Sequence, residues 1–155
     1  MNGYAGKILR VNLTNKKATI EDLKPELCKE YIGGRGFAAK ILFDELKKGI
    51  DPLSAENKIV IASGPLSGLY LPAGGKLTFA SKSPATNSYG DSNIGGIMAA
   101  EIKYAGYDVI IIEGASEKPC YIFIENSKIE VRDASDLWGK GAIIAEKMLK
   151  DKLGE

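Results

Sequence analysis

The sequence predicts one α+β domain, and two patterns carry this prediction. Short runs of branched and aromatic residues, separated by turn-forming residues, are typical of β-strands. Between them lie segments with apolar residues at helical spacing, of which 37–48 is the clearest. No internal repeat, low-complexity tract or linker interrupts the 155 residues. We therefore expect residues 1–155 to form a single domain with many strands and three or four helices.

The N-terminal third is predicted to contain a hairpin and two helices. Residues 7–13 (KILRVNL) and 18–23 flank a turn and are expected to pair as antiparallel strands. Pro25 occupies the favoured first position of a short helix. The second helix, 37–48, is expected to end at Gly49, because glycine tolerates the backbone conformation that terminates helices.

The remaining elements follow the same two patterns. Further strands are expected at 58–63, 76–81, 108–113, 121–125 and 128–132. The continuous apolar run at 108–113 indicates a strand that is buried on both faces. Further helices are expected at 92–105 and 140–153, with a polar loop at 84–91 before the first of them. The aromatic residues, including Trp138, are expected to pack in the core or at its edge.

Composition excludes several classes of protein. The net charge of +1 gives no preference for nucleic acid or an anionic membrane. No apolar run reaches the roughly 20 residues of a membrane span, and the start lacks the pattern of a secretory signal, so we expect a cytoplasmic protein. There is no histidine, and Cys28 and Cys120 form no CxxC pair. We expect both cysteines to be buried and free, and no zinc or iron–sulfur site made from this chain alone.

Three glycine-rich segments are the candidates for ligand binding: 33–36, 64–68 with 74–75, and 90–96. Glycine lets the backbone approach a ligand closely. None of the three has the spacing of a P-loop or a dinucleotide-binding fingerprint, which argues against an NTPase or a Rossmann dehydrogenase. The alternative is that these glycines only form tight turns.

The segment around Asn93 has the clearest physical interpretation. Ser92 and Asn93 are expected to begin a helix, and Gly95 and Gly96 would leave its first backbone amides uncovered. A bare helix N-terminus binds anions such as phosphate without a charged side chain. The alternative is that Asn93 only caps its own helix.

Two cations lie among the glycines. Arg35 and Lys76 could each reach an anionic ligand across bare backbone. The alternative for both is an ordinary solvated surface charge.

Eight stretches form one ordered series across about residues 3–141. They are GKILRVNL (6–13), GGRG (33–36), DPLSAENKIVIASGPLSG (51–68), PAGGKLTFASKSP (72–84), SNIGG (92–96), AEIKYAGYDVIIIEG (100–114), EKPCYIFI (117–124) and VRDASDLWGK (131–140). This series resembles the N-terminal domain of the aldehyde:ferredoxin oxidoreductase family. Several long stretches in one order are far more specific than a single glycine motif.

The resemblance implies a fold and a chemistry. Members of the family oxidise aldehydes to carboxylic acids and pass the electrons to ferredoxin. They bind tungsten, or sometimes molybdenum, through two pterins beside one [4Fe-4S] cluster. Their first domain is a β-rich base, with mixed sheets, on which the bis-pterin cofactor lies.

The resemblance also implies roles for particular residues. Asn93 matches an asparagine whose backbone carbonyl helps to hold a magnesium ion between the two pterin phosphates, and Gly95 and Gly96 match the adjoining backbone. Lys76 stands where the best-studied members carry an arginine that links pterin and cluster, and lysine keeps the charge but loses the planar fork. The predicted cofactor-binding residues are Arg35, Lys76, Ser92, Asn93, Gly95 and Gly96.

No catalytic residue is predicted in this chain. The family's cluster cysteines, later pterin motifs and proton-transferring residues lie in two downstream helical domains, which are absent here. We therefore expect the chain alone to be inactive, to bind the cofactor weakly, and to expose apolar surface that would favour self-association into a homo-oligomer. The alternatives are a free-standing module or accessory subunit that binds a pterin or another phosphorylated ligand without catalysis, and a scaffold without a ligand.

Overall fold

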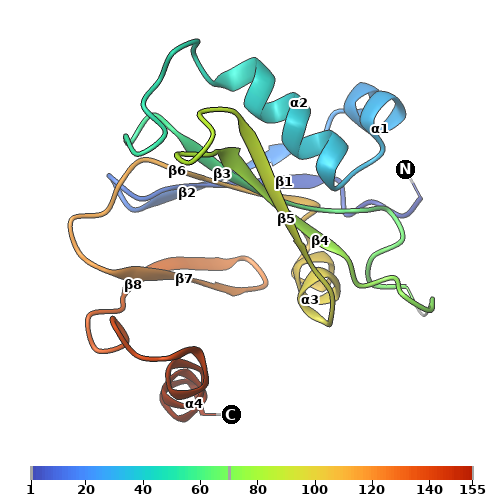
Figure 1. The fold of residues 1–155 in the computed structure, drawn as a ribbon. Helices are drawn as coiled ribbons and strands as arrows, with labels where there is room; N and C mark the ends of the chain where they lie inside the picture. The colour runs from blue at the N-terminus through green and yellow to red at the C-terminus, as the bar shows by residue number, and fades with distance from the viewer. Residues whose placement is uncertain (1, 70, 155) are drawn as a thin grey trace.

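The computed structural model describes residues 2–69 and 71–154, which form a six-stranded mixed sheet, a two-stranded hairpin and four helices (Figure 1). The elements are β1 (Lys7–Asn12), β2 (Lys17–Asp22), α1 (Pro25–Tyr31), α2 (Arg35–Glu45), β3 (Lys58–Ser63), β4 (Leu77–Lys82), β5 (Tyr89–Ile94), α3 (Met98–Tyr104), β6 (Val109–Glu113), β7 (Cys120–Glu125), β8 (Lys128–Asp133) and α4 (Ala142–Leu153).

The main sheet has the strand order β2-β1-β6-β3-β4-β5. Its central strand β6 pairs in parallel with β1 and antiparallel with β3. Val109, Ile110 and Ile111 are buried, as the continuous apolar run predicts for a strand covered on both faces. The α+β class and the mixed sheet are therefore confirmed.

Helices α1 and α2 cover one face of this sheet, and the β7–β8 hairpin and α3 cover the other (Figure 1). Alternate residues of each strand point to opposite faces, so the sheet supplies two separate cores. On the first face, Phe37 and Ile41 of α2 pack against Val60, Ala80 and Ile111. On the second face, α3 and hairpin residues pack against a cluster that includes Leu9, Ile61, Leu77 and Ile110.

The segment before α3 differs from the sequence prediction. Residues 84–91 are not all loop and no helix begins at Ser92-Asn93, because residues 89–94 form the edge strand β5. Six residue pairs join β5 to β4, and this pairing outweighs the local tendency of serine and asparagine to cap a helix. Helix α3 begins only at Met98, after Ile97, which makes no side-chain cap.

Three smaller expectations also change. Helix α2 runs from Arg35 to Glu45 rather than over 37–48. Cys28 is buried and Cys120 only half-buried, and both are free thiols. Trp138 is 76% exposed and belongs to neither core.

None of the helices within the described residues has the length and apolar character that crossing a membrane requires.

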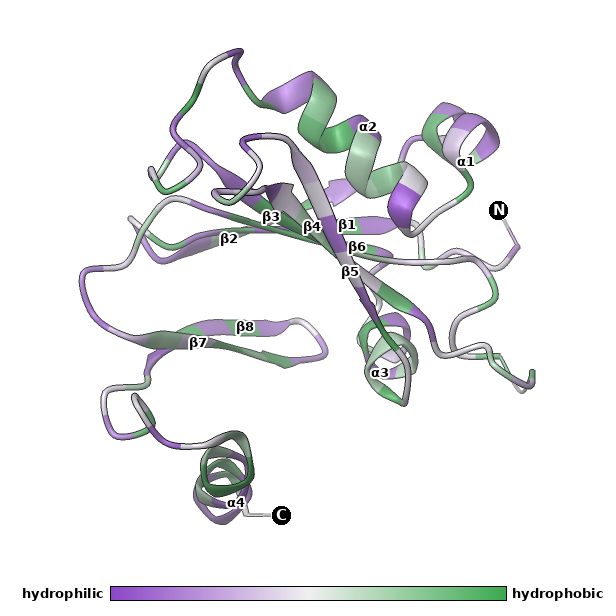
Figure 2. Cartoon of the chain, in the orientation of Figure 1, coloured by the Kyte–Doolittle hydropathy of each residue, from purple (hydrophilic) through white to green (hydrophobic). Residues whose placement is uncertain are grey.

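The C-terminal part presents apolar surface. Helix α4 lies beyond the hairpin, on the side away from the main sheet (Figure 1), and buries none of its residues. Ile143 is 85% exposed and Ile144 is also exposed. Figure 2 shows hydrophobic colour on part of α4. An apolar helix face with this exposure is typical of a surface that another element covers.

Asp108 joins the N-terminal segment to β3 and α3. Its carboxylate accepts hydrogen bonds from the backbone N–H groups of Ala5 (3.1 Å) and Gly6 (2.7 Å), and it forms an ion pair with Lys103. Its backbone carbonyl accepts a hydrogen bond from the Ser63 hydroxyl at 3.0 Å. Asp108 is fully buried, and these contacts supply its hydrogen-bond partners; Lys103 also donates to the Gly3 carbonyl at 2.7 Å.

A second ionic cluster surrounds Glu45, the last residue of α2. Glu45 accepts hydrogen bonds from Arg10 (2.8 Å) and Lys58 (2.6 Å), and both cations also contact Glu113. Burial alone would raise the pKa values of the two carboxyls. The hydrogen bonds and charges of Arg10 and Lys58 outweigh burial, and both pKa values are lowered from the ordinary value of 4.5.

The first prediction concerns Asp108. Replacing it with alanine should reduce the free energy of unfolding by about 3–5 kcal/mol, because the Lys103 ammonium, on a side chain only 9% exposed, would lose its carboxylate partner, and the part-buried N–H groups of Ala5 and Gly6 would lose their acceptor. Urea denaturation measures this change. Asp22→Ala is the control, since it removes an exposed carboxylate that also pairs with a lysine. Equal, small effects of the two substitutions would contradict the anchoring role of Asp108.

The second prediction concerns acid. A carboxyl with a lowered folded-state pKa stabilises the fold fully above its ordinary pKa of 4.5, and this contribution is lost as the pH falls through the lowered values. The free energy of unfolding should therefore decrease below about pH 4.5. In the double variant Glu45→Gln/Glu113→Gln, stability at neutral pH should be lower and its loss in acid smaller. An unchanged acid profile in that variant would show that other carboxyls control it.

Candidate functional site

The three glycine-rich segments meet at one end of the main sheet, where β3 ends, β4 begins and β5 ends. The Gly34 N–H donates a hydrogen bond to the Ser63 carbonyl at 2.8 Å. A Cβ atom on Gly33 would lie 2.9 Å from that same carbonyl oxygen. A Cβ atom on Gly75 would lie only 2.2 Å from the carbonyl oxygen of Gly96. Side chains at these two positions would therefore force the segments apart.

Asn93 is held by a buried threonine. The Thr78 hydroxyl donates a hydrogen bond to the Asn93 side-chain oxygen at 2.9 Å, across a pair of residues that face each other on β4 and β5. Gly34 packs against the same hydroxyl, because a Cβ atom there would lie 3.4 Å from it. The Asn93 side chain is thus fixed on the face that α2 covers, and it caps no helix.

The backbone of Asn93 faces the free edge of the sheet. The hairpin between β4 and β5 closes with a 2.7 Å hydrogen bond from the Ser83 N–H to the Ser88 carbonyl. In an antiparallel pair, hydrogen-bonded positions recur at every second residue, so Ser92 and Ile94 bond to β4 and Asn93 does not. Because β5 is the outermost strand, the Asn93 carbonyl points away from the sheet.

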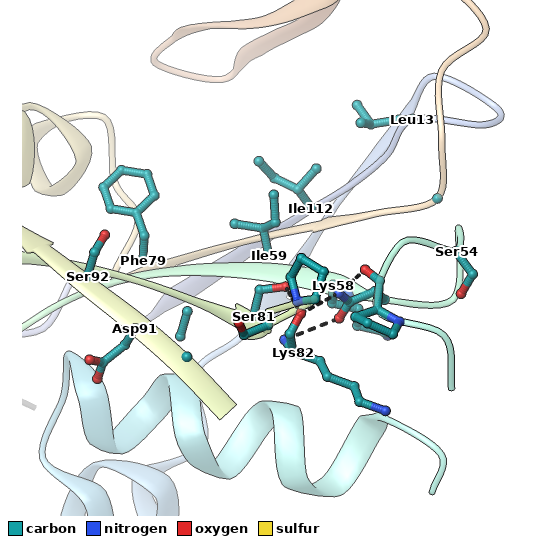
Figure 3. A pocket seen from close by; sticks show the side chains of 17 residues that line it. Leu13, Ser54, Lys58, Ile59, Phe79, Ser81, Lys82, Asp91, Ser92 and Ile112 are labelled. Carbon is teal, nitrogen blue, oxygen red and sulfur yellow. Dashed lines mark hydrogen bonds between the residues drawn. The ribbon is translucent and has the colours of Figure 1, made fainter. Parts of the chain in front are cut away.

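Ser92 lies on the other face of the sheet. Its side chain lines a pocket of about 590 Å³ with an apolar floor that includes Ile59, Phe79 and Ile112. Figure 3 shows Ser92 and Phe79 on one side of β5 and Asp91 on the opposite side. The sequence grouped Ser92 with Asn93, whereas the strand directs their side chains to opposite faces.

Arg35 is the first residue of α2 and forms an ion pair with Asp91 of β5. Its Nε and Nη2 atoms donate to the two oxygens of Asp91, the second at 3.2 Å, and the Tyr89 hydroxyl donates to the same carboxylate at 3.2 Å. Burial, followed by the charge of Asp91, raises the pKa of Tyr89 to about 12. Arg35 itself is 65% exposed.

Lys76 lies between Gly75 and β4, and it is exposed. Its carbonyl accepts a hydrogen bond from the Ser67 hydroxyl at 3.5 Å. Its ammonium group forms no ion pair with any residue of 2–69 or 71–154.

The sequence prediction missed Thr78 and Asp91. Thr78 lies in a predicted strand, but its importance depends on which residue stands opposite it. Asp91 was placed in a polar loop, where no ion pair with Arg35 could be inferred. A strand assignment for 89–94 would have revealed the alternation that points Asp91 and Asn93 to one face.

These groups can bind an anionic ligand through their positive charges and exposed backbone. They are the cations Arg35 and Lys76 at the rim and the exposed backbone of Gly95 and Gly96; the outward carbonyl of Asn93 beside them can bind a cation. A Cβ atom on Gly95 would meet nothing within 4 Å, so the space above that residue is open. Among the described residues, no three histidine, cysteine or carboxylate side chains lie together as a metal site.

The sequence matches a known family along nearly its whole length. Residues 8–155 match the model of the aldehyde ferredoxin oxidoreductase N-terminal domain. A tungsten-containing aldehyde ferredoxin oxidoreductase of Pyrococcus furiosus is 44% identical over 154 residues, which are 99% of this chain and 26% of that protein. The WOR-like subunit of an aliphatic sulfonate oxidoreductase from the same organism is 40% identical. The match covers 100% of this chain and 25% of that protein.

Solved structures include a close match to the fold. The active site complex BamBC of benzoyl coenzyme A reductase, in complex with 1,5-dienoyl-CoA, contains a chain that superposes with a TM-score of 0.96. That chain is 38% identical, and the match covers 99% of this chain and 24% of that one. This chain spans about a quarter of the length of these relatives. The chain therefore belongs to the aldehyde ferredoxin oxidoreductase family, in which it corresponds to the N-terminal domain.

Proposed function

We propose that this chain is the cofactor-binding base of a tungsten, or molybdenum, bis-pterin enzyme that oxidises an aldehyde to a carboxylic acid and passes the electrons to ferredoxin. The observation that supports this most directly is the open glycine surface beside Asn93, in a chain whose whole length matches tungsten-containing oxidoreductases. A cytoplasmic location is part of the same proposal.

The residues present fit the phosphate end of such a cofactor. The outward carbonyl of Asn93 is an oxygen ligand of the kind that magnesium prefers. The exposed backbone of Gly95 and Gly96 gives phosphate oxygens close access, since no side chain covers it. Arg35 and Lys76 add positive charge at the rim, where it would attract a doubly phosphorylated ligand.

In this proposal, the residues of this chain bind the cofactor and the cofactor carries out the redox chemistry. When bound, the metal–pterin centre supplies the two-electron redox chemistry. The chain's own groups hold and orient that centre, and the protein's acid–base groups and the ligands of the [4Fe-4S] cluster would come from outside this domain. The relatives are about four times as long as this chain, which leaves room for such domains. The apolar face of α4 is a surface on which they would pack.

The substrate is a separate part of the proposal. The tungsten-containing aldehyde ferredoxin oxidoreductases are 44% identical to this chain, compared with 40% for the sulfonate oxidoreductase subunit and 38% for the benzoyl coenzyme A reductase chain. The higher identity favours an aldehyde. Because two of these relatives are named as a subunit or as part of a complex, a role as a subunit without its own catalysis is the second candidate.

The third prediction tests the cofactor site through Gly95→Val. The valine side chain would extend into open space and cover the neighbouring backbone without disturbing the fold. In the enzyme that contains this chain, produced anaerobically with tungstate, we expect the tungsten content to fall about tenfold or more. Hydrogen bonds to a charged ligand contribute about 1.5–3 kcal/mol, which corresponds to this loss. Elemental analysis of the metal and the rate of aldehyde-dependent ferredoxin reduction measure the effect.

Two further variants make the result specific. Gly141→Val places the same side chain on another glycine with open space around it, far along the chain, and should leave the tungsten content unchanged. Gly75→Ala would collide with the Gly96 carbonyl and should lower both stability and metal content. Full tungsten loading of the Gly95→Val enzyme would refute the proposed cofactor site. Tungsten loading without aldehyde oxidation in the unchanged enzyme would favour another substrate or a non-catalytic subunit.

A further inference from the structure

We propose that Asp91 is a positioning residue that holds Arg35 in the orientation needed to bind a phosphate group of the ligand. This inference rests on the proposed function, because it concerns the same phosphate-binding end of the site. Asp91 contacts no ligand in this proposal. It acts only through Arg35, whose guanidinium carries the donors.

The ion pair occupies one edge of the guanidinium and leaves the other free. Asp91 accepts from Nε and Nη2 of Arg35. A guanidinium has five N–H donors in a rigid plane, so both hydrogens on Nη1 and one on Nη2 remain. Nη1 has no hydrogen-bond partner among the described residues, and the side chain is 65% exposed. The fixed plane therefore presents its free donors to solvent.

Arg35 is connected to the other groups of the site through β5 and Gly34. Asp91 and Asn93 are two residues apart on β5, so their side chains share the α2 face at a spacing of roughly 7 Å. Arg35 follows Gly34, which packs on the Thr78 hydroxyl that holds Asn93. Arg35 is thus bound to the same edge strand, β5, whose Asn93 carbonyl points away from the sheet.

Tyr89 keeps Asp91 in place. Asp91 is only 14% exposed and accepts the Tyr89 hydroxyl at 3.2 Å on the same face of β5. The pKa of Tyr89 is raised to about 12, so the phenol stays protonated and donates throughout the neutral range. The result is a continuous chain of contacts from Tyr89 through Asp91 to Arg35.

Two effects of Asp91 on anion binding have opposite signs. Its negative charge opposes the approach of a phosphate, which would make binding weaker. Its hold on Arg35 removes the cost of ordering a long flexible side chain during binding, which would make binding tighter. A residue that only neutralised Arg35 or only joined α2 to β5 would not produce the second effect. The direction of the change in affinity on removing the charge therefore tests the proposal.

The fourth prediction uses inorganic pyrophosphate as the probe and the protein prepared without tungstate. Isothermal titration calorimetry should show that Asp91→Asn weakens pyrophosphate binding roughly threefold to tenfold, although a negative charge has been removed. Asp91→Glu should recover part of the affinity, because it keeps the carboxylate. Arg35→Ala should weaken binding at least as much as Asp91→Asn.

The controls separate positioning from stability and from overall charge. Asp22→Asn removes an exposed carboxylate from β2, at the opposite edge of the sheet, and should leave the affinity unchanged. Partial unfolding would lower the binding stoichiometry rather than the affinity, and calorimetry measures both. Unchanged or tighter binding by Asp91→Asn, together with weaker binding by Arg35→Ala, would overturn the inference and leave the proposed function standing. Failure of the unchanged protein to bind pyrophosphate would count against both.

Discussion

The pairing of β5 with β4 is the interaction on which the candidate site depends. Residues 89–94 contain mostly polar or small side chains, so hydrophobic burial does little to hold them. Backbone hydrogen bonds along six paired residues set their alternation instead. That alternation directs Asp91 and Asn93 towards α2, Ser92 towards the opposite pocket, and the Asn93 carbonyl towards the free edge. A shift of one residue would reverse every one of these directions.

Close backbone packing is the second constraint, and it explains why glycine occurs in three separate segments. Gly33 lies against the end of β3, and Gly75 lies against the carbonyl of Gly96. These glycines allow close contacts between segments, because a side chain at either position would collide with the backbone of another segment. Gly95 differs, because nothing in the protein occupies the space beside it. The candidate site therefore combines glycines that bring the segments together with one that leaves their surface open.

The ionic groups of the domain and the groups at its glycine surface have different roles in the structure. Its buried or half-buried ionic groups, Asp108 with Lys103 and Glu45 with Arg10, connect elements of the fold. The groups that face that surface are backbone atoms and two exposed cations. In the proposed function, chemistry at this site comes from a bound group and from other domains. The exposed apolar face of α4 and the fourfold greater length of the relatives agree with this arrangement.

The sequence alone determined the fold class, the family and most of the elements, because burial patterns such as the apolar run at 108–113 are local and periodic. It also identified the glycine segments and Arg35, Lys76 and Asn93 as candidates, although the structure does not itself test their binding roles. Only the tertiary structure decided that 89–94 is a strand and that Asp91 pairs with Arg35. A polar edge strand has no apolar periodicity of its own, and its conformation comes from backbone hydrogen bonds to the preceding strand β4.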